Sequence, residues 1–163
     1  AADLIDDFNL GMSLFPGTDA PDEQAPNCAG PREVLDLDDY RGDLAAFTAS
    51  YPRQDPPRAN LTPTRLALAT LRDQALFELE DDAEPNRPRA VVLLTDGLPN
   101  VPSAPAVCDW GEDDQAGVLA EVSALSALGV RIFSVGMIGA DAQHMQQVAN
   151  RGTPGWQTGD EDQ

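Results

Sequence analysis

The stretch "VVLLTDGLPN", residues 91–100, decides the fold that this sequence predicts. Four branched apolar residues lead directly into Thr95, Asp96 and Gly97. An apolar run without polar alternation is typical of a strand in a parallel sheet, because both faces of such a sheet are usually covered. We therefore predict a fully buried strand over residues 90–97 that ends on an acid.

The chain after this strand predicts a β-α-β unit. Residues 113–128 place apolar side chains at helical spacing, and Gly129 is expected to stop this helix. "VRIFSVGM", residues 130–137, then predicts a second buried strand. Two buried strands joined through a helix indicate an α/β fold whose sheet is largely parallel.

The flanking segments predict further elements. "NLGMSLFPG", residues 9–17, reads as a short strand, and "REVLDL", residues 32–37, alternates as a half-exposed edge strand does. Helices are predicted over residues 1–8, 38–51, 62–82 and 141–150, and a long loop over residues 98–113.

The composition limits the class of partner. The chain has 163 residues, enough for one domain with a sizeable core. Its 28 acidic residues against 10 arginines give a net charge of −18, which repels nucleic acid and anionic membranes and attracts cations. No apolar run approaches the roughly 20 residues of a membrane span.

Two oxygen-bearing residues are candidates for a site at the carboxyl edge of the sheet. Asp96 ends the predicted strand, and Thr62 stands at the start of a predicted helix. Ligands of open α/β sheets bind at this edge, and such donors suit Mg²⁺ or Mn²⁺. Each residue also has a simpler interpretation, because Asp-Gly forms turns and Thr caps helices. The single histidine, His144, is expected to be a solvated surface residue.

In this order, "NLTPTRLAL", "VVLLTDGLPN", "GVRIFSVGM" and "DAQHMQQVANRGT" resemble the von Willebrand factor type A (vWA) domain, particularly its bacterial secreted and surface members. The resemblance covers nearly the whole chain. It implies a three-layer, Rossmann-like α/β fold, with a mostly parallel central sheet, helices on both faces and "REVLDL" as an antiparallel edge strand.

The resemblance also implies a metal-ion-dependent adhesion site at the carboxyl edge of the sheet. Thr62 would be its hydroxyl ligand and Asp96 its acid, holding Mg²⁺ or Mn²⁺. A protein partner would complete the site with an acidic side chain. Members of this kind are extracellular, on the cell surface or periplasmic, and they are not enzymes.

Two departures from the family pattern weaken the predicted site. Asn60-Leu61 stands where the family has Gly-Gly, and no Asp-x-Ser-x-Ser loop precedes it. We therefore expect residues 1–163 to form a single vWA-like domain that is incomplete at both ends, without the family's first strand and its last strand and helix. With three of the usual oxygen ligands missing, we expect magnesium to bind with a dissociation constant of about 1 mM at best.

The two cysteines, Cys28 and Cys108, leave two interpretations open. They are either two free thiols or one disulfide that ties two loops together. A disulfide would place the domain outside the cytosol.

Two other functions compete with metal-dependent binding. One is a vWA-like scaffold with a degenerate metal site that binds partners without metal. The other is a Mg²⁺-dependent phosphoryl hydrolase, which the sequence disfavours because it lacks a second strand-end acid, a Gly-rich phosphate loop and a nucleophile beside a base.

Overall fold

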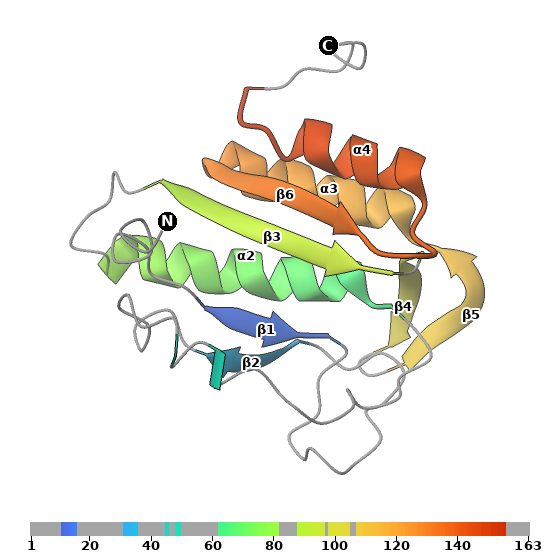
Figure 1. Ribbon diagram of the computed structural model, residues 1–163. Helices are drawn as coiled ribbons and strands as arrows, with labels where there is room; N and C mark the ends of the chain where they lie inside the picture. The colour runs from blue at the N-terminus through green and yellow to red at the C-terminus, as the bar shows by residue number, and fades with distance from the viewer. Residues whose placement is uncertain are drawn as a thin grey trace.

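The computed structural model describes residues 11–15, 31–35, 45, 48–49, 62–81, 88–96, 98–104 and 107–155 (Figure 1). Within these ranges the strands are β1 (Met12–Leu14), β2 (Arg32–Leu35), β3 (Arg89–Thr95), β4 (Asn100–Ala104), β5 (Val107–Asp113) and β6 (Val130–Gly136). The helices are α2 (Thr64–Asp81), α3 (Gln115–Ala127) and α4 (Ala142–Arg151). The chain is therefore a mixed α/β protein, as predicted.

The described strands form three separate pairs. β3 and β6 are parallel, with Val92 opposite Phe133 and Leu94 opposite Val135. β1–β2 and β4–β5 are antiparallel, and both have irregular register. The structure thus confirms the parallel β-α-β unit and the antiparallel pairing of the strands in "NLGMSLFPG" and "REVLDL". Only one of the three described pairs is parallel, so a mostly parallel central sheet is not established.

The core lies between the β3–β6 pair and the three described helices; in Figure 1, α3 lies behind these strands and α4 lies beside β6. Alternate strand residues face the helices, among them Leu93 of β3 and Ile132 of β6. The buried residues of the cluster come from all of these elements: Leu68, Leu93, Val118, Leu119, Val122, Leu125, Val130, Ile132 and Val148. Outside the core, Arg72 of α2 donates a hydrogen bond to Glu121 of α3, which joins these two helices at their surface.

The opposite side of β3 and β6 is exposed. Val92, Leu94, Phe133 and Val135 have exposed fractions between 45% and 56%. We call these four side chains the open face. The prediction that both strands are fully buried is therefore wrong, because an unbroken apolar run does not tell a strand covered on one side from a strand covered on both. Helices on both faces remain unconfirmed, since the described helices pack on one.

The observed helices agree closely with those predicted from the sequence. Residues 62–82, 113–128 and 141–150 were predicted to be helical, and α2, α3 and α4 differ from these ranges only at their ends. α3 ends as expected at Gly129, whose φ of 82° is readily adopted by glycine. None of the described helices is both long and apolar enough to cross a membrane.

One predicted loop is instead a hairpin. Residues 98–113 contain β4 and β5, which pair antiparallel. Prolines and the absence of alternation hid this pair in the sequence, because Pro cannot donate to a strand ladder and shifted register breaks the period of two.

Several predicted elements lie outside the described residues. These include the helix over residues 1–8, most of the helix over 38–51 and the tail after residue 155. Within 38–51, the described residues Ala45, Thr48 and Ala49 are helical.

Candidate functional site

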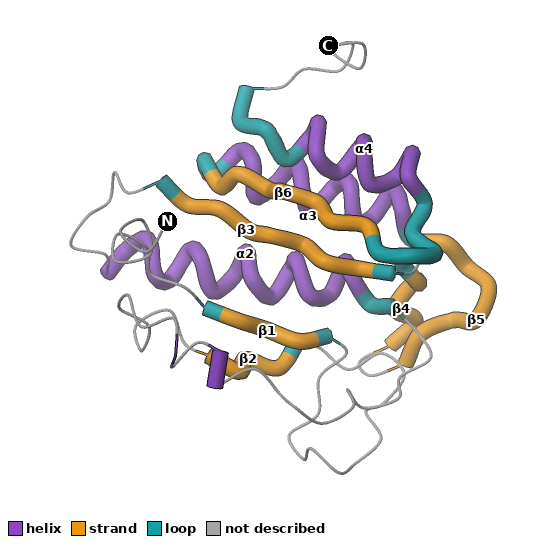
Figure 2. Tube along the Cα trace, viewed as in Figure 1, coloured by secondary structure: helices purple, strands orange, loops and turns teal. Residues whose placement is uncertain are grey.

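The candidate site lies at the edge where β3 and β6 end (Figure 2). Asp96 follows β3 directly, and its side chain is exposed. The backbone N–H of Met137, just after β6, donates to the carbonyl oxygen of Thr95 at 2.9 Å. The last residues of the two strands are therefore held together, and Asp96 stands at the carboxyl edge as predicted.

Thr62 is fixed to the segment that follows Asp96. Its backbone N–H donates to Asn100 Oδ1 at 2.8 Å, and the backbone N–H of Asn100 donates to the Thr62 carbonyl at 3.0 Å. These two reciprocal bonds join the start of α2 to the start of β4. The flanking prolines, Pro63 and Pro99, are fully buried and make the junction rigid. The structure thus connects the Thr62 segment to the one downstream of Asp96.

The same junction positions the start of α3. Asp114 donates its backbone N–H to the Pro99 carbonyl at 2.9 Å. Its buried carboxylate lies 3.0 Å from Arg65 Nε, at an angle that makes an ion pair but no hydrogen bond to Oδ2. Burial raises the pKa of Asp114 above its ordinary value; the Arg65 charge opposes this shift and the Asp113 charge adds to it. The ion pair therefore ties Arg65 of α2 to Asp114 at the start of α3.

Gly117 makes this ion pair possible. A Cβ at residue 117 would lie 2.1 Å from Asp114 Oδ1 and 2.6 Å from Arg65 Cδ. The glycine therefore leaves room for the two side chains to meet over the first turn of α3.

The start of α4 completes the edge. Asp141 is its N-cap, and Oδ1 accepts hydrogen bonds from the backbone N–H groups of Gln143 at 2.8 Å and His144 at 3.1 Å. The bond from the His144 backbone is the largest cause that lowers the Asp141 pKa, and the Gln115 side chain of α3 adds to this lowering. The first residue of α3 therefore influences the N-cap of α4 at this edge.

His144 is not the surface residue that the sequence suggested. It is only 5% exposed, and among the described residues its Nδ1 has no hydrogen-bond partner. Its spacing of four residues from buried Val148 places it on the core side of α4, a signal that its polar sequence neighbours obscured. Burial lowers the pKa of His144, and the charges of Asp113 and Asp141 oppose that shift.

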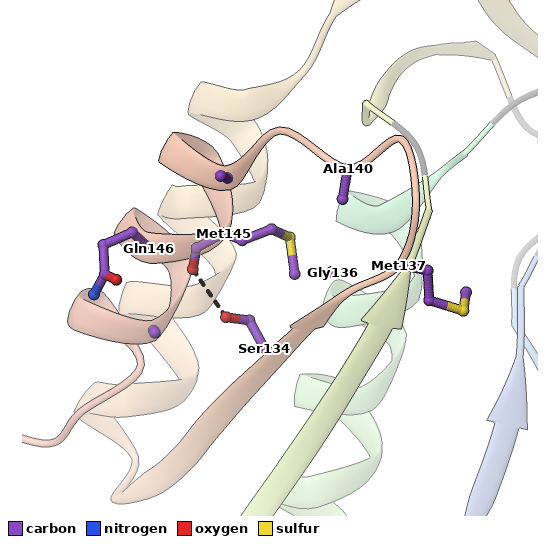
Figure 3. A pocket seen from close by; sticks show the side chains of 8 residues that line it. Ser134, Gly136, Met137, Ala140, Met145 and Gln146 are labelled. Carbon is purple, nitrogen blue, oxygen red and sulfur yellow. Dashed lines mark hydrogen bonds between the residues drawn. The ribbon is translucent and has the colours of Figure 1, made fainter.

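A hollow of about 330 Å³ lies between β6 and α4, close to the same edge (Figure 3). The Ser134 hydroxyl donates to the Met145 carbonyl at 2.8 Å on its wall. The Met145 side chain extends toward Gly136, where a Cβ would lie 3.2 Å from Met145 Cγ. Its lining contains no acid, histidine or cysteine, and the hydroxyl of Ser134 has no base among the lining residues to activate it.

Comparisons of the chain with protein-family models, curated proteins and solved structures gave no match.

A hard divalent cation fits the candidate site only in part. Thr62 and Asp96 provide a hydroxyl and a carboxylate, the oxygen donors that Mg²⁺ and Mn²⁺ prefer. Among the described residues, however, no group of three or more His, Cys, Asp or Glu is placed to hold a metal ion. The described residues thus offer two candidate oxygen donors at this edge.

The remaining site predictions have different outcomes. Cys28 lies outside the described residues and Cys108 lies in β5, so the choice between two free thiols and one disulfide stays open. Sequence reasoning missed Asn100, Arg65 and Asp114. Asn100 was visible as the end of the motif "TDGLPN", but nothing in the sequence indicated that it binds the backbone of a residue 38 positions earlier.

Proposed function

We propose that this chain is a divalent-cation-dependent protein-binding domain of the vWA type, with its cation at the carboxyl edge beside β3. Asp96 and Thr62 are the two residues that would hold Mg²⁺ or Mn²⁺. The bound cation would supply a positive charge for an acidic side chain of a protein partner. The proposal includes the family's three-layer, Rossmann-like arrangement and a location outside the cytosol.

The observation that carries the proposal is the pair of hydrogen bonds between Thr62 and Asn100, at 2.8 and 3.0 Å. Two candidate ligands far apart in sequence could serve one cation only if their segments lay close together, and these bonds hold the Thr62 segment against Asn100, four residues after Asp96. The exposed carboxylate of Asp96 adds support, because it is open to a ligand from solvent. A binding role is favoured over catalysis, since the lining of the hollow near this edge contains no acid, histidine or cysteine, and the Ser134 hydroxyl donates to the Met145 carbonyl.

Paramagnetic broadening of amide NMR signals by Mn²⁺, followed residue by residue, tests the proposal. We expect Mn²⁺ to broaden the amide NMR signals around Asp96 and Thr62 at lower concentration than signals elsewhere, with a Mg²⁺ dissociation constant on the order of 1 mM. Because the chain has a net charge of −18, only an effect confined to this edge is informative. Asp96→Asn and Thr62→Val each remove one proposed ligand atom and are expected to weaken the effect.

Asp73→Asn is the matched control, because it removes an exposed carboxylate from α2 far from the first turn. This variant is expected to keep the localised broadening. Broadening that spreads evenly over the acidic surface, or that is unchanged in Asp96→Asn, would contradict the proposal.

A metal-free scaffold is the second candidate. Its support is that no metal-holding group of three such residues occurs in the described part of the chain. Partner binding that is unchanged by EDTA and by Asp96→Asn would favour the scaffold over the metal-dependent domain.

A further inference from the structure

β3 has one edge that no described strand covers. It pairs with β6 along one side, while β1, which lies on the other side of β3 in the view of Figure 1, pairs only with β2. The outer edge of β6 differs, because Ile132 N–H donates to the Gly152 carbonyl at 2.8 Å and the end of α4 thereby covers part of that edge. We call the side of β3 away from β6 the free edge.

The free edge presents the backbone groups of three residues. In a strand, the N–H and C=O of one residue point to the same edge, and successive residues alternate between the two edges. The Thr95 carbonyl accepts from Met137 N–H just after β6, so the groups of Thr95 face β6. Because the β3–β6 register is unbroken, the groups of Ala90, Val92 and Leu94 face the free edge. Among the described residues, none of these three has a backbone partner there.

The free edge lacks the features that usually protect an edge strand. Natural edge strands carry Pro, inward charges or β-bulges, which discourage pairing with another chain. From Ala90 to Leu94 the sequence is AVVLL, and β3 keeps a regular register with β6, whereas both antiparallel pairs are irregular. A regular apolar edge with unpaired backbone groups is a template to which an extended chain adds as a further strand.

The surroundings of the free edge indicate the chemistry of the strand that fits it. An extended backbone supplies donors and acceptors in line with those of the free edge. Such a strand has Val92 and Leu94 as cross-strand neighbours, and both are about half exposed, so apolar side chains on that face would bury them. The charge of −18 repels a second copy of the chain and attracts a basic partner, and exposed Asp96 places one acid at the end of the free edge.

We infer that the free edge of β3 binds an extended segment of a basic partner protein, which adds to β3 as a further strand. Alternate apolar side chains of this segment pack beside Val92 and Leu94, and its flanking basic residues meet the acidic surface. The inference goes beyond the proposed function, because it assigns a second interaction surface that needs no cation.

Amide hydrogen exchange of the chain alone tests whether the edge is free. We expect the N–H groups of Val92 and Leu94 to exchange about tenfold faster than that of Leu93, which faces β6. Protection of Val92 and Leu94 in dilute solution would show that another part of this chain covers the edge. Protection only at high concentration would show that a second copy does, and either result would overturn the inference.

A peptide of three valines alternating with two threonines, with two lysines at each end, tests the partner chemistry in EDTA. Its binding is expected to slow exchange at Val92 and Leu94 about tenfold. N-methylation of either the central valine or an adjacent threonine removes one N–H without changing the charge, and these two N–H groups point to opposite edges of the peptide. We expect one methylated peptide to bind about tenfold more weakly than the other.

Val92→Lys and Phe133→Lys are matched variants, because the two residues lie opposite each other on the open face and the substitutions change the net charge equally. Only residue 92 borders the free edge. We expect Val92→Lys to weaken binding of the lysine peptide about tenfold and Phe133→Lys to weaken it several-fold less.

The outcomes separate strand addition from general attraction between opposite charges. Equal binding of the two methylated peptides, or an equal effect of the two variants, would show that charge alone attracts the peptide and would overturn the inference. Failure of the lysine peptide to bind, equally tight binding when glutamates replace its lysines, or binding that requires Mg²⁺ would also overturn it. The Mn²⁺ measurement tests the proposed function separately, so either proposal can fail without the other.

Discussion

His144 shows how a single buried side chain makes the stability of this protein depend on pH. Its ring is almost fully enclosed at the first turn of α4, and Nδ1 has no partner among the described residues. The positive end of the helix dipole adds to the cost of charging a ring in this position. The folded protein therefore favours neutral His144, in agreement with its lowered pKa.

We expect the folded protein to lose stability as pH falls below about 6.5, the ordinary histidine pKa. The unfolded chain then binds a proton at His144 more readily than the folded chain, so the free energy of unfolding decreases until pH passes below the folded-state pKa. The chain has one histidine, which makes this side chain the main candidate in that interval. Urea unfolding of the wild type and of His144→Asn at neutral and mildly acidic pH measures the effect. An equal pH dependence in both proteins would rule out this role for His144.

The junction between α4 and β6 depends on close packing of one residue against a backbone. Gly152 donates its N–H to the Val148 carbonyl at 2.8 Å and accepts from Ile132 N–H at 2.8 Å. A Cβ at residue 152 would lie 2.6 Å from Ile132 Cβ and 2.8 Å from the Ile132 carbonyl oxygen. These atoms belong to a strand and to a β-branched side chain next to its backbone, so they cannot move aside independently.

Gly152→Ala is therefore expected to lower the free energy of unfolding by about 1–3 kcal/mol. Gly117→Ala is the informative comparison, because its neighbours are the side chains of Asp114 and Arg65, which can rotate. Alanine also favours a helix over glycine by about 1 kcal/mol, which offsets part of the clash at residue 117. Urea denaturation of the two variants should rank Gly152→Ala as the more damaging, and the reverse order would contradict this account.

Local sequence patterns predicted some elements well and others poorly, for identifiable reasons. The helices and the β3–β6 pair follow from apolar spacing and from the stop at Gly129, which are local signals. The β4–β5 hairpin was not predicted, because Pro102 lies inside a strand with shifted register. The partial exposure of Val92 and Phe133 was not predicted, because it depends on which elements cover the sheet and not on the sequence of the strands themselves.

At the scale of the whole molecule, the candidate site was only partly predictable. Asp96 could be placed because the carboxyl ends of parallel strands meet at one edge, a rule of the fold. The contact between Thr62 and Asn100 could not be predicted, because its two hydrogen bonds join the segment before α2 to the first residue of β4, and neither segment follows a periodic pattern. The Arg65–Asp114 ion pair could not be predicted either, because it forms only where residue 117 has no Cβ to occupy the space between the two side chains.

The open face has a consequence for how the protein behaves at high concentration. At neutral pH the charge of −18 keeps molecules apart, even though the side chains of Val92, Leu94, Phe133 and Val135 are available for contact. This electrostatic repulsion disappears near the isoelectric point of about 4.1, where it no longer opposes the short-range attraction between apolar surfaces. We expect static light scattering to give a second virial coefficient that turns negative as pH approaches this value.

Phe133→Thr is expected to move that change of sign to lower pH, whereas Ile138→Ser, which lies off the open face, is expected to move it less. A shift of equal size in both variants would mean that exposed apolar area in general drives the attraction. Charge repulsion, which salt screens and low pH removes, therefore opposes association through the open face, so salt and pH are expected to govern storage and crystallisation.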